Sequence, residues 1–285
     1  MENERDILTV QNLNKSYETF KLRDVSFILK AGTIMGFIGR NGAGKTTTLK
    51  SMVNLVHADS GSVHYFGLDL KTREAEIKQR ISFAFGGVDY YLQKKLGTIT
   101  SVYKRCYDQW DEKAYDDYLS RFELDPNKRI KELSQGMRVK YSLALALSHH
   151  AQILIPDEPT SGLDPVSRDD ILTIFEDVVD GNQASILFST HITSDLDKCA
   201  DDITYIKNGQ ILFSEDSDRF VDSYRLVEGP LDRLTEALKL LIIGYHERRG
   251  EFSGMINTRD LKMAPGIKCS PADLEAIMVH MERRA

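Results

Sequence analysis

A glycine-rich segment directly after a fully apolar run constrains this chain more than any other feature. Residues 34–38 are nearly all apolar, as expected of a strand that is buried on both faces. The segment Gly39-Arg40-Asn41-Gly42-Ala43-Gly44-Lys45-Thr46 follows at once. Glycines let backbone N–H groups approach phosphate oxygens closely, and a helix predicted over residues 45–55 would point its positive end at the same anion. The sequence therefore predicts a strand–loop–helix unit that binds phosphate.

The spacing G-x-x-x-x-G-K-[ST] assigns a role to each side chain of this loop. Lys45 can reach the β- and γ-phosphates of a nucleotide, and the Thr46 hydroxyl can bind Mg²⁺. The expected ATP-binding residues of the loop are Gly39, Arg40, Asn41, Gly42, Ala43, Gly44, Lys45, Thr46 and Thr47. The alternative is a glycine-rich turn without a ligand, which the flanking strand and helix patterns disfavour.

Two carboxylates follow a second apolar strand, predicted over residues 151–156. Ligands bind at the carboxyl ends of the strands in a parallel sheet, which places Asp157 to hold Mg²⁺. Glu158 is then placed to act as the general base on the attacking water. An exposed acidic turn is the alternative for this segment on its own.

His191 follows a third apolar strand, predicted over residues 184–189, and lies 33 positions after Glu158. From there its imidazole could touch the terminal phosphate or orient Glu158. Taken alone, a single histidine is more often structural.

The order of the elements predicts an α/β fold. A helix over residues 171–179 separates two short apolar strands, and strand–helix–strand units give right-handed crossovers and a parallel sheet. Strands before residue 38 form an antiparallel β subdomain, and a helical subdomain at about 88–150 is inserted between strands. Asn208-Gly209 predicts a hairpin. We expect one domain over residues 1–215 and a small C-terminal α+β accessory domain over 216–285.

The C-terminal segment carries helix and strand patterns but no chemical motif. A strand is predicted over residues 224–228, an amphipathic helix from Pro230 through Leu241, and a strand over 240–245. Ser270 is predicted to cap a helix whose apolar face consists of Leu274, Ile277, Met278 and Met281. Dimerisation or packing is the favoured role, with a regulatory sensor and a stabilising lid as alternatives.

Composition limits the function classes. The 37 basic and 43 acidic residues give a net charge of −6, which argues against a protein that coats nucleic acid. Three widely spaced cysteines form neither a disulfide framework nor a zinc motif, which favours a reducing compartment. The charged N-terminus does not resemble a secretory signal, and no apolar run is long enough to cross a bilayer.

With these motifs in order, residues 5–215 resemble the ATP-binding subunit of an ABC transporter, a P-loop NTPase. Leu133-Ser134-Gln135-Gly136-Met137 resembles the family's Leu-Ser-Gly-Gly-Gln signature, and Ser134 is expected to cap a helix that begins near Gln135. Ser161-Gly162-Leu163-Asp164 resembles its D-loop, and His191 its switch histidine. Tyr17 lies where the family has an aromatic ring that stacks on adenine; a core tyrosine is the alternative. In its detailed sequence the chain resembles the exporter-type subunits of Gram-positive bacteria, near those linked to bacitracin-type antibiotic efflux.

The resemblance implies ATP and Mg²⁺ as cofactors and Glu158 and His191 as catalytic residues. Two ATP molecules are expected between two head-to-tail subunits, with Ser134, Gln135, Gly136 and Asp164 contacting the ATP of the opposite subunit. ATP binding would close the dimer and hydrolysis would open it. The helical subdomain would transmit this movement to a separate transmembrane permease. The subunit would then lie in the cytoplasm, on the inner face of the membrane. Homodimer, heterodimer and cargo stay open.

The chain departs from the family pattern at three places. The glutamine expected after the strand at 81–85 is replaced by Gly86, and Asp89 or Gln93 is a possible substitute. The signature-like element has Gln135 and Met137 in place of glycine and glutamine. Pro156 precedes Asp157 and removes a backbone donor, at what is expected to be the last residue of its strand.

Two other functions compete with the transporter subunit. A soluble ATPase of the same family could act on a cytosolic assembly such as a ribosome. Ribosome-acting members of the family usually carry two ATPase units, and DNA-repair members carry long coiled coils, whereas this chain has one unit and no heptad insertion. A function as a kinase or G-protein would leave the signature-like element Ser134-Gln135-Gly136 without a role.

Overall fold

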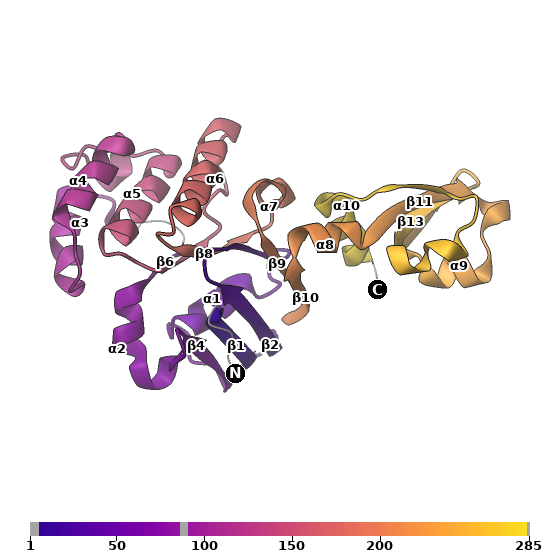
Figure 1. Cartoon of the computed structure of the whole chain (residues 1–285), viewed down its shortest axis with the longest axis horizontal. Coiled ribbons are helices and arrows are strands. Elements are labelled where there is room, and N and C mark those ends of the chain that lie inside the picture. Colours follow the sequence, from indigo (N-terminus) through magenta and orange to yellow (C-terminus); the bar gives the residue numbers. More distant parts are fainter. Residues whose placement is uncertain (1–5, 86–90, 284–285) are drawn as a thin grey trace. The chain divides into compact units, whose positions relative to one another are not determined.

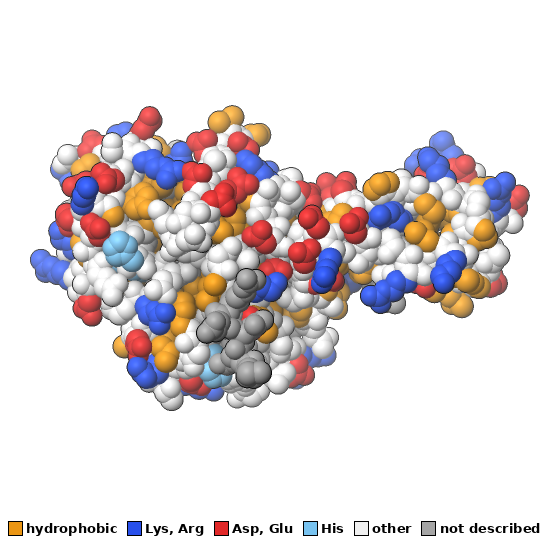
Figure 2. All heavy atoms as spheres, in the orientation of Figure 1, with side chains coloured by type: hydrophobic (Ala, Val, Ile, Leu, Met, Phe, Trp, Pro, Cys, Tyr) orange, Lys and Arg blue, Asp and Glu red, His pale blue; other side chains and the backbone are white. Residues whose placement is uncertain are grey.

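The computed structural model describes residues 6–85 and 91–283, and the chain divides into two compact units after Ser214 (Figure 1). The first unit has two β-sheets and the second unit has one, and each unit has its own apolar cluster. On the face shown in Figure 2, Lys and Arg side chains are interspersed with Asp and Glu side chains. Within the described residues, every helix is too short or too polar to cross a lipid bilayer.

A six-stranded sheet forms the centre of the first unit, as the alternating pattern predicts. Its strands are, in order, β10 (Gln210–Asp216), β9 (Asp202–Lys207), β3 (Ile34–Ile38), β8 (Ser185–Thr190), β7 (Ile153–Asp157) and β6 (Ile81–Phe85). The pairs β9–β3, β3–β8, β8–β7 and β7–β6 are parallel. The β9–β10 hairpin turns at Asn208 and Gly209, whose φ angles of 50° and 77° suit a two-residue turn. Parallel pairing brings the carboxyl ends of β3, β7 and β8 to one edge.

The first unit also contains a second, antiparallel sheet and three further helices around the central sheet. The sheet consists of β2 (Lys21–Lys30), β1 (Asp6–Ser16), β4 (Ser60–Tyr65) and β5 (Leu68–Asp69). The helices are α1 (Lys45–Met52), α6 (Pro165–Asp180) and α7 (Thr193–Cys199). One apolar cluster joins the two sheets, and within it the Phe27 and Phe37 rings lie 5.3 Å apart. The first strands and the central sheet therefore share a core.

The helical subdomain is also present. Helices α3 (Leu96–Tyr103), α4 (Glu112–Arg121) and α5 (Gln135–Ser148) lie together in Figure 1, and α2 (Leu70–Arg80) precedes β6. A buried polar network joins the three helices, because the Thr100 hydroxyl lies 2.7 Å from the Tyr115 hydroxyl and 2.9 Å from that of Tyr141. Tyr141 donates in turn to the Leu96 carbonyl at 3.0 Å. Buried hydroxyls with partners on three helices fix how these helices pack.

Two details of the first unit differ from expectation. Helix α1 ends at Met52 rather than at residue 55, because Asn54 takes a left-handed backbone (φ 59°) and Leu55 N–H bonds back to the Lys50 carbonyl. Pro156 is the penultimate residue of β7, not the last, and β7 is an interior strand. The pairs of β7 with β8 lie on either side of it, at Leu154↔Ile186 and Asp157↔Ser189. The sheet thus accommodates the missing donor and recovers its register at Asp157.

The second unit is an antiparallel sheet with short helices. Its strands are β12 (Ile243–Arg248), β13 (Glu251–Asn257), β11 (Tyr224–Pro230) and β14 (Lys268–Pro271), in that order, and its helices are α8 (Ser217–Asp222), α9 (Glu236–Leu241) and α10 (Leu274–Arg283). The predicted apolar face of α10 is buried, at Leu274, Ile277, Met278 and Met281. A separate apolar cluster includes Val227, Leu238 and Phe252.

The prediction of one continuous helix after Pro230 was wrong. A single turn over Leu231–Arg233 ends where Leu234 becomes extended, and α9 starts anew because the Thr235 hydroxyl accepts the Leu238 N–H at 3.1 Å. The leucine spacing is real, since Leu231 and Leu234 still pack on the cluster around Leu238. The following strand begins at Ile243, so it does not overlap this helix.

The predicted cap at Ser270 was also wrong. Ser270 and Pro271 belong to β14 and pair with Leu226 and Arg225 of β11. The Asp273 carboxylate accepts the Ala276 N–H at 2.7 Å, and the Asp273 carbonyl accepts the Ile277 N–H. Asp273 therefore caps α10, and strand pairing takes the residues that the sequence pattern assigned to the helix start.

We expect Asp273→Ala to speed amide exchange in the first turn of α10 about five-fold, because losing an N-cap costs about 1 kcal/mol. Hydrogen–deuterium exchange of the full chain, read on the peptide covering residues 274–280, measures this. Ser270→Ala is the matched control and should leave exchange there unchanged. A larger effect from Ser270→Ala than from Asp273→Ala would contradict the assignment.

Candidate functional site

The glycine-rich loop connects β3 to α1. Gly44 stands at the N-cap of α1 with φ 113°, and a Cβ there would lie 2.7 Å from both Leu22 and Phe20. Only glycine fits this backbone and this close approach. The Thr48 N–H and hydroxyl both bond to the Gly44 carbonyl at 2.9 Å, which holds the first turn. The N-terminal end of α1 therefore presents N–H groups of the loop, as anion binding needs.

Lys45 is the most buried charge of the loop, at 6% exposed. Its ammonium donates to the Gly39 carbonyl at 2.7 Å and pairs with Glu158 Oε1 at 3.0 Å. The lysine thus folds back over its own loop, with a carboxylate from β7's end as its counter-charge. A phosphate group entering this loop competes with Glu158 for the same ammonium.

Asp157, the last residue of β7, meets the start of α1. The Thr46 hydroxyl donates to Asp157 Oδ2 at 2.8 Å, and the Ser189 hydroxyl donates to Asp157 Oδ1. Sequence analysis paired Thr46 with Asp157, and the structure brings the two together. Their oxygens form a hard donor set of the kind that Mg²⁺ prefers.

Glu158 lies between Lys45 and His191. Its Oε2 is 2.7 Å from His191 Nδ1, and its backbone is left-handed, with φ 52°. The Glu158 N–H bonds to both the carbonyl and the hydroxyl of Ser189, at 3.1 and 3.0 Å. A left-handed backbone costs a non-glycine residue about 1 kcal/mol or more, and such strain gathers at functional sites. The bonds to Ser189 hold Glu158 in it.

Lys45, Glu158 and His191 line one cleft, with a volume of about 770 Å³, whereas Asp157, which accepts a hydrogen bond from Thr46, lines a second pocket. The first cleft is lined by Tyr17, Thr19, Phe20, Arg40, Asn41, Gly42, Gly44, Lys45, Thr46, Thr47, Glu158, Ser161 and His191. Tyr17 follows β1 and is 45% exposed, so it is not a core tyrosine. Gly39 and Ala43 belong to the loop without lining the cleft.

The signature-like residues lie outside this cleft. The Ser134 hydroxyl caps α5 by accepting the Met137 N–H at 3.2 Å, as predicted. Asp164 caps α6, and bonds from the side chain and backbone of Ser167 hold the pKa of its carboxyl below the usual range. Gly136 is buried and faces Ser167 of α6. Within one chain, therefore, Ser134, Gln135, Gly136 and Asp164 stand apart from the phosphate loop.

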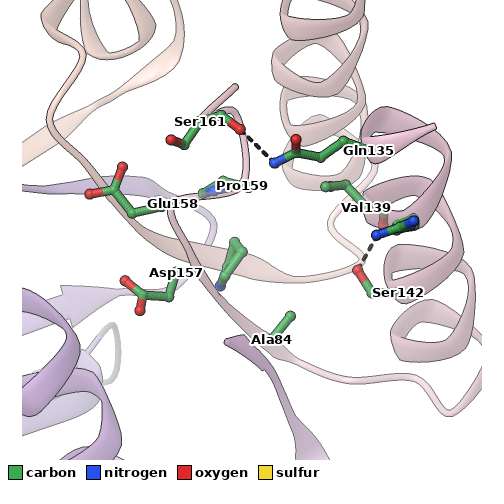
Figure 3. A pocket seen from close by; sticks show the side chains of 10 residues that line it. Ala84, Gln135, Val139, Ser142, Asp157, Glu158, Pro159 and Ser161 are labelled. Carbon is green, nitrogen blue, oxygen red and sulfur yellow. Dashed lines mark hydrogen bonds between the residues drawn. The ribbon is translucent and has the colours of Figure 1, made fainter. Parts of the chain in front are cut away.

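A second pocket, of about 330 Å³, lies between α5 and the end of β7 (Figure 3). Ala84, Gln135, Arg138, Val139, Ser142, Pro156, Asp157, Glu158, Pro159 and Ser161 line it. In Figure 3 the Gln135 side chain points across to Ser161, which also borders the first cleft. Gly86, which stands where the family has a glutamine, and Asp89, one of its two possible substitutes, lie outside the described residues. The other possible substitute, Gln93, is exposed.

Sequence reasoning missed two residues that support the site. Ser189 is fully buried and touches both Asp157 and Glu158; its place two residues before His191, on a strand paired with β7, was the available signal. Asp195 is also fully buried and accepts from the Thr160 hydroxyl at 2.5 Å, which anchors the loop after Glu158. Burial raises the pKa of Asp195.

Known proteins resemble this chain over the same region. Residues 22–161 match the family model described as ABC transporter. The ABC transporter ATP-binding protein NatA of Bacillus subtilis is 34% identical over 198 residues, which cover 67% of this chain and 80% of that protein. The bacitracin transport ATP-binding protein BcrA of Bacillus licheniformis is 30% identical over 209 residues, covering 72% of this chain and 68% of BcrA.

A solved structure titled as the ATP-binding subunit of an ABC transporter has a similar fold. The TM-score is 0.67 at 25% identity, and the match covers 75% of this chain and 91% of that one. A dimeric post-hydrolysis cassette bound to ADP and phosphate, 20% identical with a TM-score of 0.65, has the same fold. Together with the loop of residues 39–47, these likenesses show that the chain belongs to the ABC transporter family, as an ATP-binding subunit that hydrolyses ATP.

Proposed function

We propose that this chain hydrolyses MgATP at the cleft between β3 and β7 to drive export through a separate transmembrane permease. The contact of Glu158 with both Lys45 and His191 carries the proposal. These two contacts bring the candidate base, the cation expected to bind phosphate and the candidate switch histidine together at one edge of the central sheet. The bacitracin transport role in the name of the relative BcrA supports export of an antibiotic-like cargo.

The cleft fits a nucleoside triphosphate. Tyr17 lies at its border with an exposed ring, on which adenine stacks. Residues 39–47 then surround the phosphates with backbone N–H groups, and Lys45 turns from Glu158 to the β- and γ-phosphates. Thr47 and Arg40 line the same wall.

Thr46 and Asp157 fit Mg²⁺, because their oxygens already meet at 2.8 Å at the loop's end of the cleft. The bound cation neutralises charge that develops on the phosphates. The Ser189 hydroxyl donates to Asp157 Oδ1, so that Asp157 Oδ2 is the oxygen beside Thr46. These two bonds fix the orientation of the Asp157 carboxylate.

Glu158 acts as general base in this proposal. Its carboxylate takes a proton from water as the water oxygen bonds to the γ-phosphorus, and the bond to the β–γ bridging oxygen breaks, so that ADP leaves with that electron pair. His191 holds Glu158 Oε2 and so orients the carboxylate towards the phosphate.

A second ATP-binding subunit completes the site. The α5 helix begins at Gln135, so the backbone N–H groups of Gln135 and Gly136 and the Ser134 hydroxyl offer an anion site that its own cleft does not use. In a head-to-tail dimer these groups meet the γ-phosphate of the ATP in the opposite subunit, and Asp164 is a further contact to that ATP. The permease partner places this subunit in the cytoplasm, on the inner face of the membrane.

We expect Glu158→Gln to form a stable dimer on addition of MgATP, because ATP binds and persists when no base activates the water. Size-exclusion chromatography with light scattering measures the doubling in mass. Lys45→Ala in the same background should stay monomeric, and Lys113→Ala, an exposed lysine of α4, should dimerise normally. A Glu158→Gln protein that binds ATP as a monomer would exclude pairing of two copies of this chain.

Ser189→Ala should lower kcat for ATP hydrolysis at least ten-fold, since it removes the hydroxyl's bond to the charged Asp157 carboxylate, which contributes about 1.5 kcal/mol or more, and its bond from the Glu158 N–H. The KM for ATP should change little, because residues 39–47 are untouched. Steady-state kinetics gives both constants, with Ser101→Ala on α3 as control. A kcat equal to that of the wild type would show that the Ser189 hydroxyl does not orient Asp157 and Glu158 for hydrolysis.

Affinity capture of the tagged chain from gently solubilised membranes of its host tests the permease. We expect a polytopic membrane protein in near-equal amount by mass spectrometry. Recovery only from the soluble fraction, with ribosomal or other cytosolic proteins, would contradict the transporter role and favour the soluble ATPase.

A further inference from the structure

A side-chain contact joins the helical subdomain to the loop that follows Glu158. The Gln135 amide donates from Nε2 to the Ser161 carbonyl at 2.6 Å, the contact marked by a dashed line in Figure 3. The Gln135 Oε1 atom lies 3.1 Å from where a Cβ on Gly162 would stand. The amide therefore lies flat against the Ser161–Gly162 turn, and the turn has room for it because Gly162 has no side chain.

The turn leads directly to the general base candidate. Ser161 N–H bonds to the Glu158 carbonyl at 3.2 Å, and Leu163 N–H bonds to the Thr160 carbonyl at 3.2 Å. Thr160 is tied from the other side by the buried Asp195. The loop is thus fixed at one end by β8 and α7, while its Ser161–Gly162 corner is exposed or half-buried and bonds to α5 through Gln135.

Two other contacts between α5 and α6 lie away from this corner. The Lys140–Asp170 ion pair, at 2.9 Å, lies more than a helical turn further along α5, and Gly136 packs on Ser167. These contacts hold the helices together without touching residues 159–162. The Gln135 amide, which bonds to the Ser161 carbonyl, joins α5 directly to the corner.

From this geometry we infer that Gln135 is a positioning residue, whose side-chain amide holds the Ser161–Gly162 corner and through it the orientation of Glu158. The inference rests on the proposed role of Glu158 in hydrolysis. It gives a use to the residue at which the signature departs from glycine, and it leaves the backbone N–H of Gln135 for the opposite subunit. The Gln135 side chain acts on the reaction through the loop, not on the phosphate.

Three substitutions separate the hydrogen bond from the shape of the side chain. Gln135→Glu keeps the shape but has no N–H donor, so its carboxylate faces the Ser161 carbonyl. Gln135→Ala removes the side chain, and Gln135→Lys keeps a donor of similar reach. Gln210→Glu, an exposed residue on β10, makes the same change of charge elsewhere and is the matched control.

Hydrogen–deuterium exchange on the full chain without nucleotide, read on residues 160–164, tests the contact first. Gln135→Glu and Gln135→Ala should exchange about five-fold faster, the factor that corresponds to one hydrogen bond, and Gln135→Lys should stay within about two-fold of wild type. Unchanged exchange in both Gln135→Ala and Gln135→Glu overturns the inference.

Steady-state ATPase kinetics then tests the consequence. The kcat of Gln135→Glu and Gln135→Ala should fall by a similar factor, with Gln135→Lys rescuing it and the KM for ATP moving less than about two-fold. Faster exchange with a wild-type kcat would also overturn the positioning role. A wild-type chain that does not hydrolyse ATP would instead overturn the proposed function. The exchange measurement alone would then show whether the Gln135–Ser161 bond holds the corner.

Discussion

The parallel pairing of β3, β8 and β7 is the constraint on which the rest of the site depends. It brings the residues that follow these strands, Lys45, His191 and Glu158, to one edge of the sheet although they lie far apart in the sequence. The strands pair this way because they are buried on both faces and joined by helices. Glu158 can then contact Lys45 and His191 at once, at 3.0 and 2.7 Å.

The strained backbone of Glu158 shows how the sheet and the site support each other. A left-handed glutamate is stable here because Ser189, on the neighbouring strand, accepts its N–H twice. The same Ser189 hydroxyl donates to Asp157, so one buried side chain sets both carboxylates. The loop after Glu158 continues this support through the Thr160–Asp195 bond and the Gln135–Ser161 bond.

The first unit could be predicted largely from the sequence, because its strands, its glycine-rich loop, the Ser134 cap and the Asn208-Gly209 turn are local signals. The second unit could not be predicted as well. The leucine spacing after Pro230 is that of a helix, yet the Thr235 cap splits it, and strand pairing claims Ser270. Contacts between distant segments, such as Gln135 with Ser161 or Ser189 with Asp157, leave no periodic pattern and required the structure.

A crystal structure of the wild-type chain with Mg²⁺ and a non-hydrolysable ATP analogue would show whether the phosphates displace Glu158 from Lys45. We expect phosphate oxygens to take the place of Glu158 Oε1 beside Lys45, the metal to lie between Thr46 and Asp157, and adenine to stack on Tyr17. A nucleotide bound away from residues 39–47, or a Lys45–Glu158 contact that persists with the triphosphate in the cleft, would contradict this expectation.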